Sequence, residues 1–283
     1  PDVVISFLDT MNVLTLCATT GLGLPVIVCE QADPRQYTIG AAWELLRRMF
    51  YPKAVALVVV ASAMVKWAEL MVRKDRIRVI PNPVYVSPSG SRARSDHQGQ
   101  RYTIVAMGRL VKQKGFDLLL NAFEQCKDRH PDWSLVILGE GDERKDLEAL
   151  RAQLVLEDRV SFLGRVKEPT TILRRADLFV MSSRFEGFPL ALIEAMACGL
   201  PVISADCPTG PSEIIRDDID GILVSPNNVE ALAFAMDRLM GNQAERQRLG
   251  ACAVEVVERF GIEEIMNKWN EVISYANQAT NID

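Results

Sequence analysis

Short apolar runs alternate with amphipathic stretches along the first part of the chain. The apolar runs predict buried strands at Val3–Leu8, Val26–Cys29, Val55–Val60 and Arg78–Ile80. Between them, apolar residues recur at helical spacing near 10–20, 41–51 and 62–73. Strands that are apolar throughout and alternate with helices are typical of a parallel sheet covered on both faces.

A polar segment separates this part from a second alternating series. Residues 81–101 hold three prolines and a run of Gly, Ser and charged residues, so we expect a linker over 86–101. Strands are then expected at Thr103–Met107, Ser134–Leu138, Val160–Leu163, Leu178–Met181, Pro201–Ser204 and Ile222–Val224. Helices are expected near 116–129, 143–154, 169–175, 190–198, 211–216, 229–240, 244–259 and 262–277.

The pattern predicts an α/β protein of two doubly wound parallel-sheet domains, over residues 1–85 and 102–260, with a final helix in 261–283. The first domain is expected to be incomplete. The chain begins directly in a strand-like run at Pro1-Asp2-Val3 without a starting Met, so we expect it to be truncated at its N-terminus.

Composition excludes several classes of protein. With 48% hydrophobic and 24% charged residues the chain is a typical globular protein, and its net charge of −5 argues against nucleic acid as the main partner. Residues 1–100 carry 11 Lys/Arg and 8 Asp/Glu, whereas residues 101–283 carry 21 and 29. The basic first part is compatible with an anionic membrane surface, and ordinary surface variation is the simpler interpretation.

The supply of cysteine and histidine limits the chemistry. Six scattered cysteines without close pairs indicate small buried side chains in a reducing, cytoplasmic compartment. Two histidines are too few for a His-rich metal site, and neither lies in a context that suggests a Ser-His-Asp triad. No signal peptide is evident, and no apolar run reaches the length of about 18 residues that spans a bilayer.

Ligands of such sheets bind beyond the carboxyl ends of the strands, so the loops that follow strands hold the candidate chemistry. After Thr103–Met107, Arg109, Lys112 and Lys114 place three cations within six residues of a helix start. Positive charge and free backbone N–H groups there suit an anion. A solvated basic loop is the alternative.

A glycine-rich turn follows the next strand. Gly139-Glu140-Gly141-Asp142 lacks the third glycine of a dinucleotide-binding fingerprint, because position 144 is Arg. We interpret it as a tight strand-to-helix turn that brings backbone close to a ligand, and not as a nicotinamide site.

The loop after Leu178–Met181 is the most informative. Pro189 suits the first turn of a helix and Gly199 its C-terminal cap, which puts Glu186 on the loop and Glu194 inside the helix. Backbone N–H groups near residues 187–190 can meet a phosphate. Glu194 lies among apolar residues, so it should be partly buried and need a hydrogen-bonding partner. A capping Glu and an ordinary helical Glu are the alternatives.

Taken together, these motifs resemble retaining glycosyltransferase family 4. Glu186 and Glu194 are separated by seven residues, with Gly-Phe-Pro after the first and Ala-Met-Ala-x-Gly-x-Pro-Val-Ile after the second. Other matching segments follow in the expected order: Ile80–Val84, Gly108-Arg109-Leu110…Lys114-Gly115, Leu138–Gly141, Val160–Gly164, Gly210–Ile215 and Asp220–Val224. The resemblance covers residues 101–240.

The resemblance implies a GT-B fold, in which two Rossmann-like domains face each other across a cleft and a nucleotide sugar binds mainly to the second. It also implies that the last helix, with Trp269, packs back toward the first domain. The expected activity is retaining transfer of a hexose or N-acetylhexosamine, from a UDP-linked donor, to a glycan or lipid-linked glycan in cell-surface polysaccharide synthesis.

The same resemblance assigns roles to individual residues. Arg109 and Lys114 would bind the donor diphosphate and stabilise the leaving group, and Glu186 would hold hydroxyls of the transferred sugar. Glu194 would accept from the ribose hydroxyls. The remaining donor-binding residues expected are Gly108, Gly139, Leu163, Gly164, Arg165, Gly187, Phe188, Pro189 and Leu190, of which the loop near 163–166 would meet the base.

No cofactor or obligatory metal is expected, because the family neutralises the diphosphate with cations and a helix N-terminus. Many members place a His after the second strand seen here, where this chain has Cys29-Glu30-Gln31. The missing N-terminal strand and loop, which hold the donor phosphate in the family, put the activity of this chain by itself in doubt.

Several alternatives stay open. The helix at Ala42–Lys53 could lie on the cytoplasmic face of a membrane, although an ordinary helix with one buried face is the simpler interpretation. A nucleotide-sugar epimerase or a phosphorylase would keep the fold and change the reaction. A non-catalytic protein that retains a nucleotide-sugar pocket is the rival from another class.

Overall fold

The computed structural model describes residues 1–85 and 101–279, and the expected linker at 86–101 lies outside them except for Arg101. The chain divides into two units, each compact by itself. Unit 1 comprises Pro1–Pro83 and Phe260–Asp283, and unit 2 comprises Val84–Arg259. The last helix of the chain therefore belongs to unit 1, together with the first strands.

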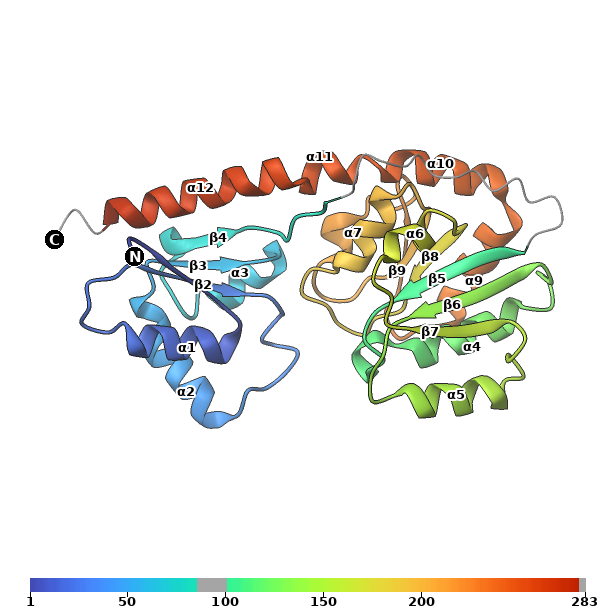
Figure 1. The fold of residues 1–283 in the computed structure, drawn as a ribbon, viewed down its shortest axis with the longest axis horizontal. Coiled ribbons are helices and arrows are strands. Elements are labelled where there is room, and N and C mark those ends of the chain that lie inside the picture. The colour runs from blue at the N-terminus through green and yellow to red at the C-terminus, as the bar shows by residue number, and fades with distance from the viewer. Residues whose placement is uncertain (86–100, 280–283) are drawn as a thin grey trace. The chain divides into compact units, whose positions relative to one another are not determined.

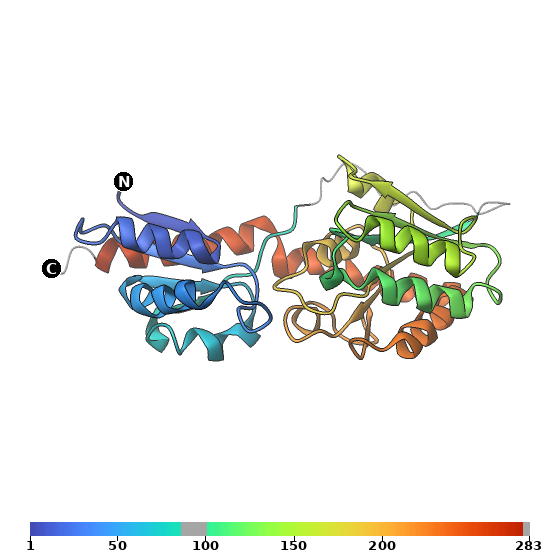
Figure 2. The same cartoon turned by 90° about the horizontal axis from the view of Figure 1, so that it is seen from below.

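Unit 1 is built on a four-stranded parallel sheet (Figures 1 and 2). Its strands are β1 Val4–Phe7, β2 Val26–Glu30, β3 Ala56–Val59 and β4 Ile77–Val79, in the order β1-β2-β3-β4. Because this order has no reversal, right-handed crossovers bring the intervening helices to the same face. These helices are α1 Asp9–Ala18, α2 Ala41–Phe50 and the short α3 Val65–Ala68.

The final helix, α12 Ile262–Ala279, covers the other face of this sheet, as Figure 1 shows. Figure 2, seen from below, has α1 and α2 in front and α12 behind. Ile265, Val272 and Ala276 of α12 join one buried cluster with sheet residues. The sheet members of that cluster are Ile27, Cys29, Ala56, Val58 and Ile80. Trp269 packs near Phe7, with ring centroids 6.0 Å apart.

Unit 2 contains a six-stranded sheet in which every paired neighbour is parallel. Its strands are β5 Tyr102–Met107, β6 Trp133–Leu138, β7 Val160–Gly164, β8 Leu178–Met181, β9 Val202–Ala205 and β10 Ile222–Val224. The order β10-β9-β8-β5-β6-β7 places the first strand of the unit in the middle. The chain moves outward from β5 to one side and then to the other, so the sheet has a topological switch point between β5 and β8.

Helices cover both faces of this sheet (Figure 1). They are α4 Phe116–Cys126, α5 Arg144–Gln153, α6 Pro169–Leu173, α7 Leu190–Ala197, α8 Pro211–Ile214, α9 Val229–Gly241, α10 Gln243–Ala253 and α11 Val256–Phe260, the last of which ends at the boundary with unit 1. The core between the sheet, α4 and α9 includes Ile104, Phe123, Leu135 and Met236, all fully buried. The doubly wound fold expected for this domain is confirmed.

Three predicted helices differ from the structure. Residues 62–73 were expected to form one helix. They form a 3₁₀ turn, η2 Ser62–Met64, followed by α3 and two further turns. The α-helix does not continue beyond α3, because the N–H groups of Leu70 and Met71 donate to carbonyls three residues back. The segment 244–259 divides into α10 and α11, where Glu255 and Val257 make the same short bonds. The β-branched residues at this break disfavour a continuous helix. The helix expected at 211–216 ends at Ile214 because Ile215 is extended.

The described residues contain no helix that is both long and apolar enough to cross a bilayer.

Candidate functional site

The candidate site of unit 2 lies where the loops after β5 and β8 meet at the switch point. Lys114 ends a 3₁₀ turn, η4 Lys112–Lys114, that follows β5, and Glu186 lies on the loop after β8. The Lys114 ammonium donates to Glu186 Oε1 at 2.6 Å. Two of the expected site residues, 72 positions apart in sequence, thus form one ion pair.

Glu186 is held firmly on one side only. Its side chain is buried, and the Ser183 hydroxyl donates to the same Oε1 atom at 2.6 Å. Within the described chain, no hydrogen bond occupies Glu186 Oε2. Lys114 keeps a partly exposed side chain and, with three ammonium protons, two donors beyond the ion pair. Both residues can therefore bind further groups.

The two loops approach each other closely enough to require glycine. Gly115 has a φ of 62°, and a Cβ there would lie 2.2 Å from the Ser182 carbonyl oxygen. The Ser182 hydroxyl donates to the Lys114 carbonyl at 3.1 Å, and the Gln113 side-chain amide donates to the Phe185 carbonyl at 2.9 Å. The positions of Lys114 and Glu186 are thus fixed by contacts between the loops that carry them.

The glycine turn after β6 makes a second close approach. A Cβ on Gly139, whose φ is 140°, would lie 1.8 Å from the Gly108 carbonyl oxygen, and one on Gly141 would lie 2.4 Å from that of Leu110. The sequence predicted that backbone here approaches a ligand. The structure shows that it approaches the loop after β5, and the Gly139 N–H donates to the Gly164 carbonyl at 2.8 Å. Because these glycines have no side chain, the loops after β5, β6 and β7 can pack against one another.

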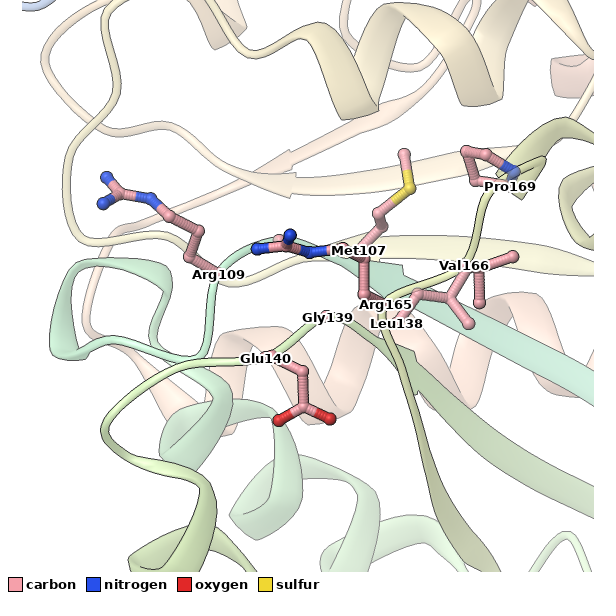
Figure 3. Close-up of a pocket in the computed structure, with 9 residues that line it drawn as sticks. Met107, Arg109, Leu138, Gly139, Glu140, Arg165, Val166 and Pro169 are labelled. Carbon is pink, nitrogen blue, oxygen red and sulfur yellow. The ribbon is translucent and has the colours of Figure 1, made fainter.

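A pocket of about 200 Å³ lies between those three loops (Figure 3). It is lined by Met107, Gly108, Arg109, Leu138, Gly139, Glu140, Arg165, Val166 and Pro169. Apolar side chains from two strand ends form part of its wall, and charged groups stand beside them. In Figure 3 the Glu140 carboxylate points away from Arg109. Glu140 accepts a hydrogen bond from Arg144 Nη1 at 3.0 Å.

Two cations that line this pocket have no partner in the described part of the chain. Arg109 and Arg165 are exposed, and neither side chain makes an ion pair or hydrogen bond within the described residues. Most other arginines of unit 2 are paired, as Arg144 is with Glu140 and Glu148. Free guanidinium groups at a pocket are suited to bind anions, because a guanidinium presents several donors in one plane.

The Glu194 carboxylate forms no ion pair with any described residue. It lies on α7 among buried apolar neighbours, and burial raises its pKa above the usual range for a Glu. The sequence indicated that this carboxylate needs a hydrogen-bonding partner. Among the described residues it has none, so its oxygens are available to hydroxyl donors from a ligand.

The start of α7 supplies backbone donors. The helix begins at Leu190, as the sequence predicts, with Pro189 as its N-cap and not in its first turn, and Gly187 and Phe188 precede it in a buried loop. In the part of the chain that the structure describes, the N–H groups of Gly187 and Leu190 have no acceptor. At the other end Gly199 has a φ of 75°, as expected for a C-terminal cap.

The predicted site residues therefore separate into two groups. Gly108, Arg109, Gly139 and Arg165 line the pocket. Lys114, Glu186, Gly187, Phe188, Pro189, Leu190 and Glu194 gather along the β8–α7 loop and its helix and do not line it. Leu163 and Gly164 end β7 next to the pocket without lining it.

Four pocket residues were not predicted as site residues: Met107, Leu138, Glu140 and Pro169, whereas Val166 belongs to the loop near 163–166 that was expected to meet the base. Met107 and Leu138 close the apolar strands β5 and β6, so the sequence pattern assigns them to the core. The signal that identifies them is their position as the last residue of a strand next to a glycine. Over the described ranges no three His, Cys, Asp or Glu side chains gather in a way that could hold a metal ion.

Comparison with known proteins gives the family. The family model for glycosyl transferases group 1 matches residues 90–255. An exopolysaccharide phosphotransferase of Streptomyces coelicolor is 38% identical over 252 residues, which are 88% of this chain and 26% of that protein. An α-1,4-N-acetyl-D-galactosaminyltransferase of Campylobacter jejuni, named for a PP-undecaprenol-linked glycan, is 30% identical over 98% of this chain and 76% of its own length.

Solved structures agree on the fold. Anabaena HepE in complex with UDP-glucose matches with a TM-score of 0.84 at 22% identity, over 96% of this chain and 78% of that one. Staphylococcus aureus TarM matches with a TM-score of 0.82 at 23% identity, over 96% and 54% of the two chains. The α/β architecture is that of the GT-B glycosyltransferases.

The chain spans 26% of the Streptomyces relative and 57% of an uncharacterized glycosyltransferase of Haemophilus influenzae. The region matched by the family model carries both the pocket and the Lys114–Glu186 ion pair. On these grounds, the chain belongs to the glycosyl transferases of group 1.

Proposed function

We propose that this chain binds a nucleoside diphosphate sugar and transfers its hexose or N-acetylhexosamine, with retention of configuration, to a glycan or lipid-linked glycan. The observation that carries the proposal is the pairing of Lys114 with Glu186 at the switch point, 2.6 Å apart. The Lys114 ammonium suits the diphosphate of such a ligand, and the free carboxylate oxygen of Glu186 suits the hydroxyls of its sugar.

The diphosphate would lie between cations and backbone donors. Within residues 1–85 and 101–279, Arg109 has no partner and the N–H groups of Gly187 and Leu190 have no acceptor, and Lys114 has two further ammonium protons to donate. Phosphate oxygens accept hydrogen bonds from all of these groups. Negative charge develops on the leaving diphosphate as the bond to the sugar breaks, so the same contacts strengthen in the transition state.

The base would occupy the pocket, and the ribose would reach Glu194 on α7. The apolar wall formed by Met107, Leu138 and Val166 suits the face of a base. Glu194, whose side chain has no partner among the described residues, would accept hydrogen bonds from both ribose hydroxyls. Uridine is proposed as the nucleoside because solved relatives of this fold bind UDP, among them HepE and TarM in complexes named for it.

The transfer step needs no carboxylate nucleophile. The acceptor oxygen bonds to the anomeric carbon on the face from which the diphosphate leaves, and the acceptor proton passes to the departing phosphate oxygen. Glu186 would orient the sugar through hydroxyl hydrogen bonds at its free oxygen. Since Arg109 and Lys114 supply the positive charge, we propose that the reaction requires neither a metal ion nor an organic cofactor.

The acceptor class is proposed from the relatives. The Campylobacter enzyme is named for an undecaprenol-linked glycan, and an Escherichia coli relative is a lipopolysaccharide 1,6-galactosyltransferase. With a lipid-linked acceptor, we propose that the transfer takes place at the cytoplasmic face of a membrane, which the protein would contact peripherally. Nucleic acid is not a proposed partner. Exopolysaccharide or lipopolysaccharide assembly is the corresponding process.

Saturation-transfer NMR against UDP-, GDP- and ADP-sugars tests the donor site. UDP-sugars should give the strongest signals on base and ribose protons, and Glu194→Ala should remove them. Product analysis by NMR then shows the anomeric configuration, and EDTA should leave turnover unchanged. Binding of no nucleotide sugar would refute the proposal. Interconversion of free nucleotide sugars would favour an epimerase, and binding without turnover would favour a non-catalytic pocket.

A further inference from the structure

We propose that Arg184 and Asp117 form a positioning clamp for the donor site. In this role the clamp holds Lys114 and Glu186 at the spacing that a bound diphosphate sugar requires. The inference rests on the proposed function, because the ligand it positions is the proposed donor. Neither residue is expected to touch that ligand.

Arg184 contacts the neighbouring loop at several points. Its Nη1 and Nη2 atoms donate to Asp117 Oδ1 and Oδ2 at 2.8 and 2.7 Å, a two-pronged contact. Nη1 also donates to the Lys112 carbonyl at 2.7 Å. The Arg184 backbone N–H donates to the Gln113 carbonyl at 2.8 Å. One residue of the β8–α7 loop thus makes four hydrogen bonds to the loop and helix that follow β5.

The residues that make these contacts flank the Lys114–Glu186 ion pair in the sequence of both loops. Lys112 and Asp117 lie on either side of Lys114 in sequence, and Arg184 lies between Ser183 and Glu186. Asp117 belongs to the first turn of α4, which is packed into the core of the unit. Through Arg184, the loop that carries Glu186 is therefore attached directly to a rigid helix. Loss of the clamp would let the two loops shift while their strands stay in place.

The Arg184–Asp117 ion pair is too exposed to contribute much to the stability of the fold. The side chains of Arg184 and Asp117 are 30% and 44% exposed, and exposed ion pairs contribute little to the free energy of folding. A planar guanidinium bound by both carboxylate oxygens nevertheless fixes orientation as well as distance. The role of the Arg184–Asp117 contact is therefore to fix the positions of the two loops. A displacement of about 1 Å in a group that binds a reacting substrate can cost two orders of magnitude in rate.

The experiment compares Arg184→Met, Arg184→Lys, Asp117→Asn and the Arg184→Met/Asp117→Asn double variant. Arg129→Met is the matched control, since Arg129 binds Asp237 at 2.7 Å and precedes β6, at the amino edge of the sheet. UDP affinity is measured by calorimetry. Amide hydrogen exchange of 112–118 and 182–188 is measured without ligand, and thermal unfolding reports stability.

Arg184→Met and Asp117→Asn should each weaken UDP binding about tenfold, and the double variant no more than either, because the two residues act as one unit. Arg184→Lys should resemble Arg184→Met, since Lys keeps the charge and loses the two-pronged contact. Exchange should rise in both loops with melting temperature nearly constant, and Arg129→Met should change neither affinity nor exchange in these loops.

Unchanged UDP affinity or unchanged exchange in Arg184→Met would overturn the clamp. A loss of affinity that follows only the melting temperature would do so as well, because the role would then be structural. Failure of the unmodified protein to bind UDP would refute the proposed function instead. The exchange data would in that case still decide whether Arg184 holds the two loops together.

Discussion

The ammonium of Lys114 and the carboxylate of Glu186 meet at 2.6 Å across the switch point of the sheet of unit 2. The pair joins the loop after β5 to the loop after β8, which become neighbours only because β5 and β8 are adjacent strands. The Ser183 hydroxyl shares the same Glu186 oxygen. One carboxylate oxygen therefore anchors the pair, and the other accepts no hydrogen bond from the described residues.

Lys114→Met should remove one of the cations that the proposed diphosphate requires. Loss of a group that stabilises developing charge lowers kcat by about 100-fold or more. Steady-state transfer from a UDP-sugar measures the effect. Lys127→Met is a suitable control, because Lys127 donates to the Leu154 carbonyl near the end of α4 and should leave kcat unchanged. Equal activity of Lys114→Met and the unmodified protein would contradict the assignment.

Glu194→Gln should stabilise the protein and weaken nucleotide binding. Burial raises the pKa of Glu194, so its contribution to stability is present below the pKa of the unfolded chain and is lost as the pH rises through the folded value. Above the folded pKa the carboxylate bears a charge that has no partner among the described residues, and Gln removes this charge. Melting temperature should rise as UDP affinity falls. A fall in melting temperature would show that Glu194 has a partner in the protein, and unchanged UDP affinity would contradict its contact with the nucleotide.

Glu30 should make the stability of unit 1 depend on pH. Burial raises its pKa to about 7 from 4.5, against the opposing effects of Arg47 and the Tyr51 hydroxyl, which donates to Glu30 Oε1. The stabilising contribution is full below pH 4.5 and lost as the pH rises through about 7. The shift of the pKa from 4.5 to about 7 corresponds to at most about 3–4 kcal/mol of stability.

Glu30→Gln tests this dependence. Arg47 would keep Glu44 at 3.0 Å and Asp9 at 3.9 Å, so its charge would not be left without a partner. Relative to the unmodified protein, the variant should gain stability between pH 5 and pH 8, as followed by hydrogen exchange of β2. A difference in stability that is constant over this range would be the contrary result.

Two glycines of unit 2 should respond differently to alanine. Gly139→Ala places a Cβ 1.8 Å from the Gly108 carbonyl oxygen, so the loops that form the pocket must separate. At Gly199 a Cβ would lie 3.5 Å from its nearest neighbour, and only the left-handed backbone is strained. We expect about 1 kcal/mol for Gly199→Ala and several times that for Gly139→Ala. Urea denaturation measures both, and similar costs would contradict the close approach.

Much of the fold could be predicted because its strands are uniformly apolar. Runs such as Val26–Cys29 and Leu178–Met181 have few alternatives to a buried strand, and the structure has strands there. Helix ends were less predictable, since the breaks within 62–73 and 244–259 depend on hydrogen bonds to carbonyls three residues back. That α12 covers the sheet of unit 1 is a tertiary relationship that its amphipathic pattern does not specify.

The site could be predicted in part for a similar reason. Loops after parallel strands meet at one edge, so Arg109, Lys114 and Glu186 were identified as candidates from position and charge. Their pairing depends on strand order, which the alternation of elements leaves open. Met107 and Leu138 were not predicted to line a pocket, because an apolar residue at the end of a strand gives the same sequence pattern whether it faces the core or a pocket.

The methyl resonance of Met107 gives the most direct test of the central claim, that unit 2 binds the nucleoside part of a sugar donor beside the Lys114–Glu186 pair. Met107 lines the pocket, so UDP added to methionine-methyl-labelled protein should shift this resonance saturably, and Glu194→Ala should abolish the shift. The account predicts this result at low ionic strength, where cation–phosphate contacts are strongest. Absence of binding, or binding that leaves the Met107 methyl unperturbed, would contradict it.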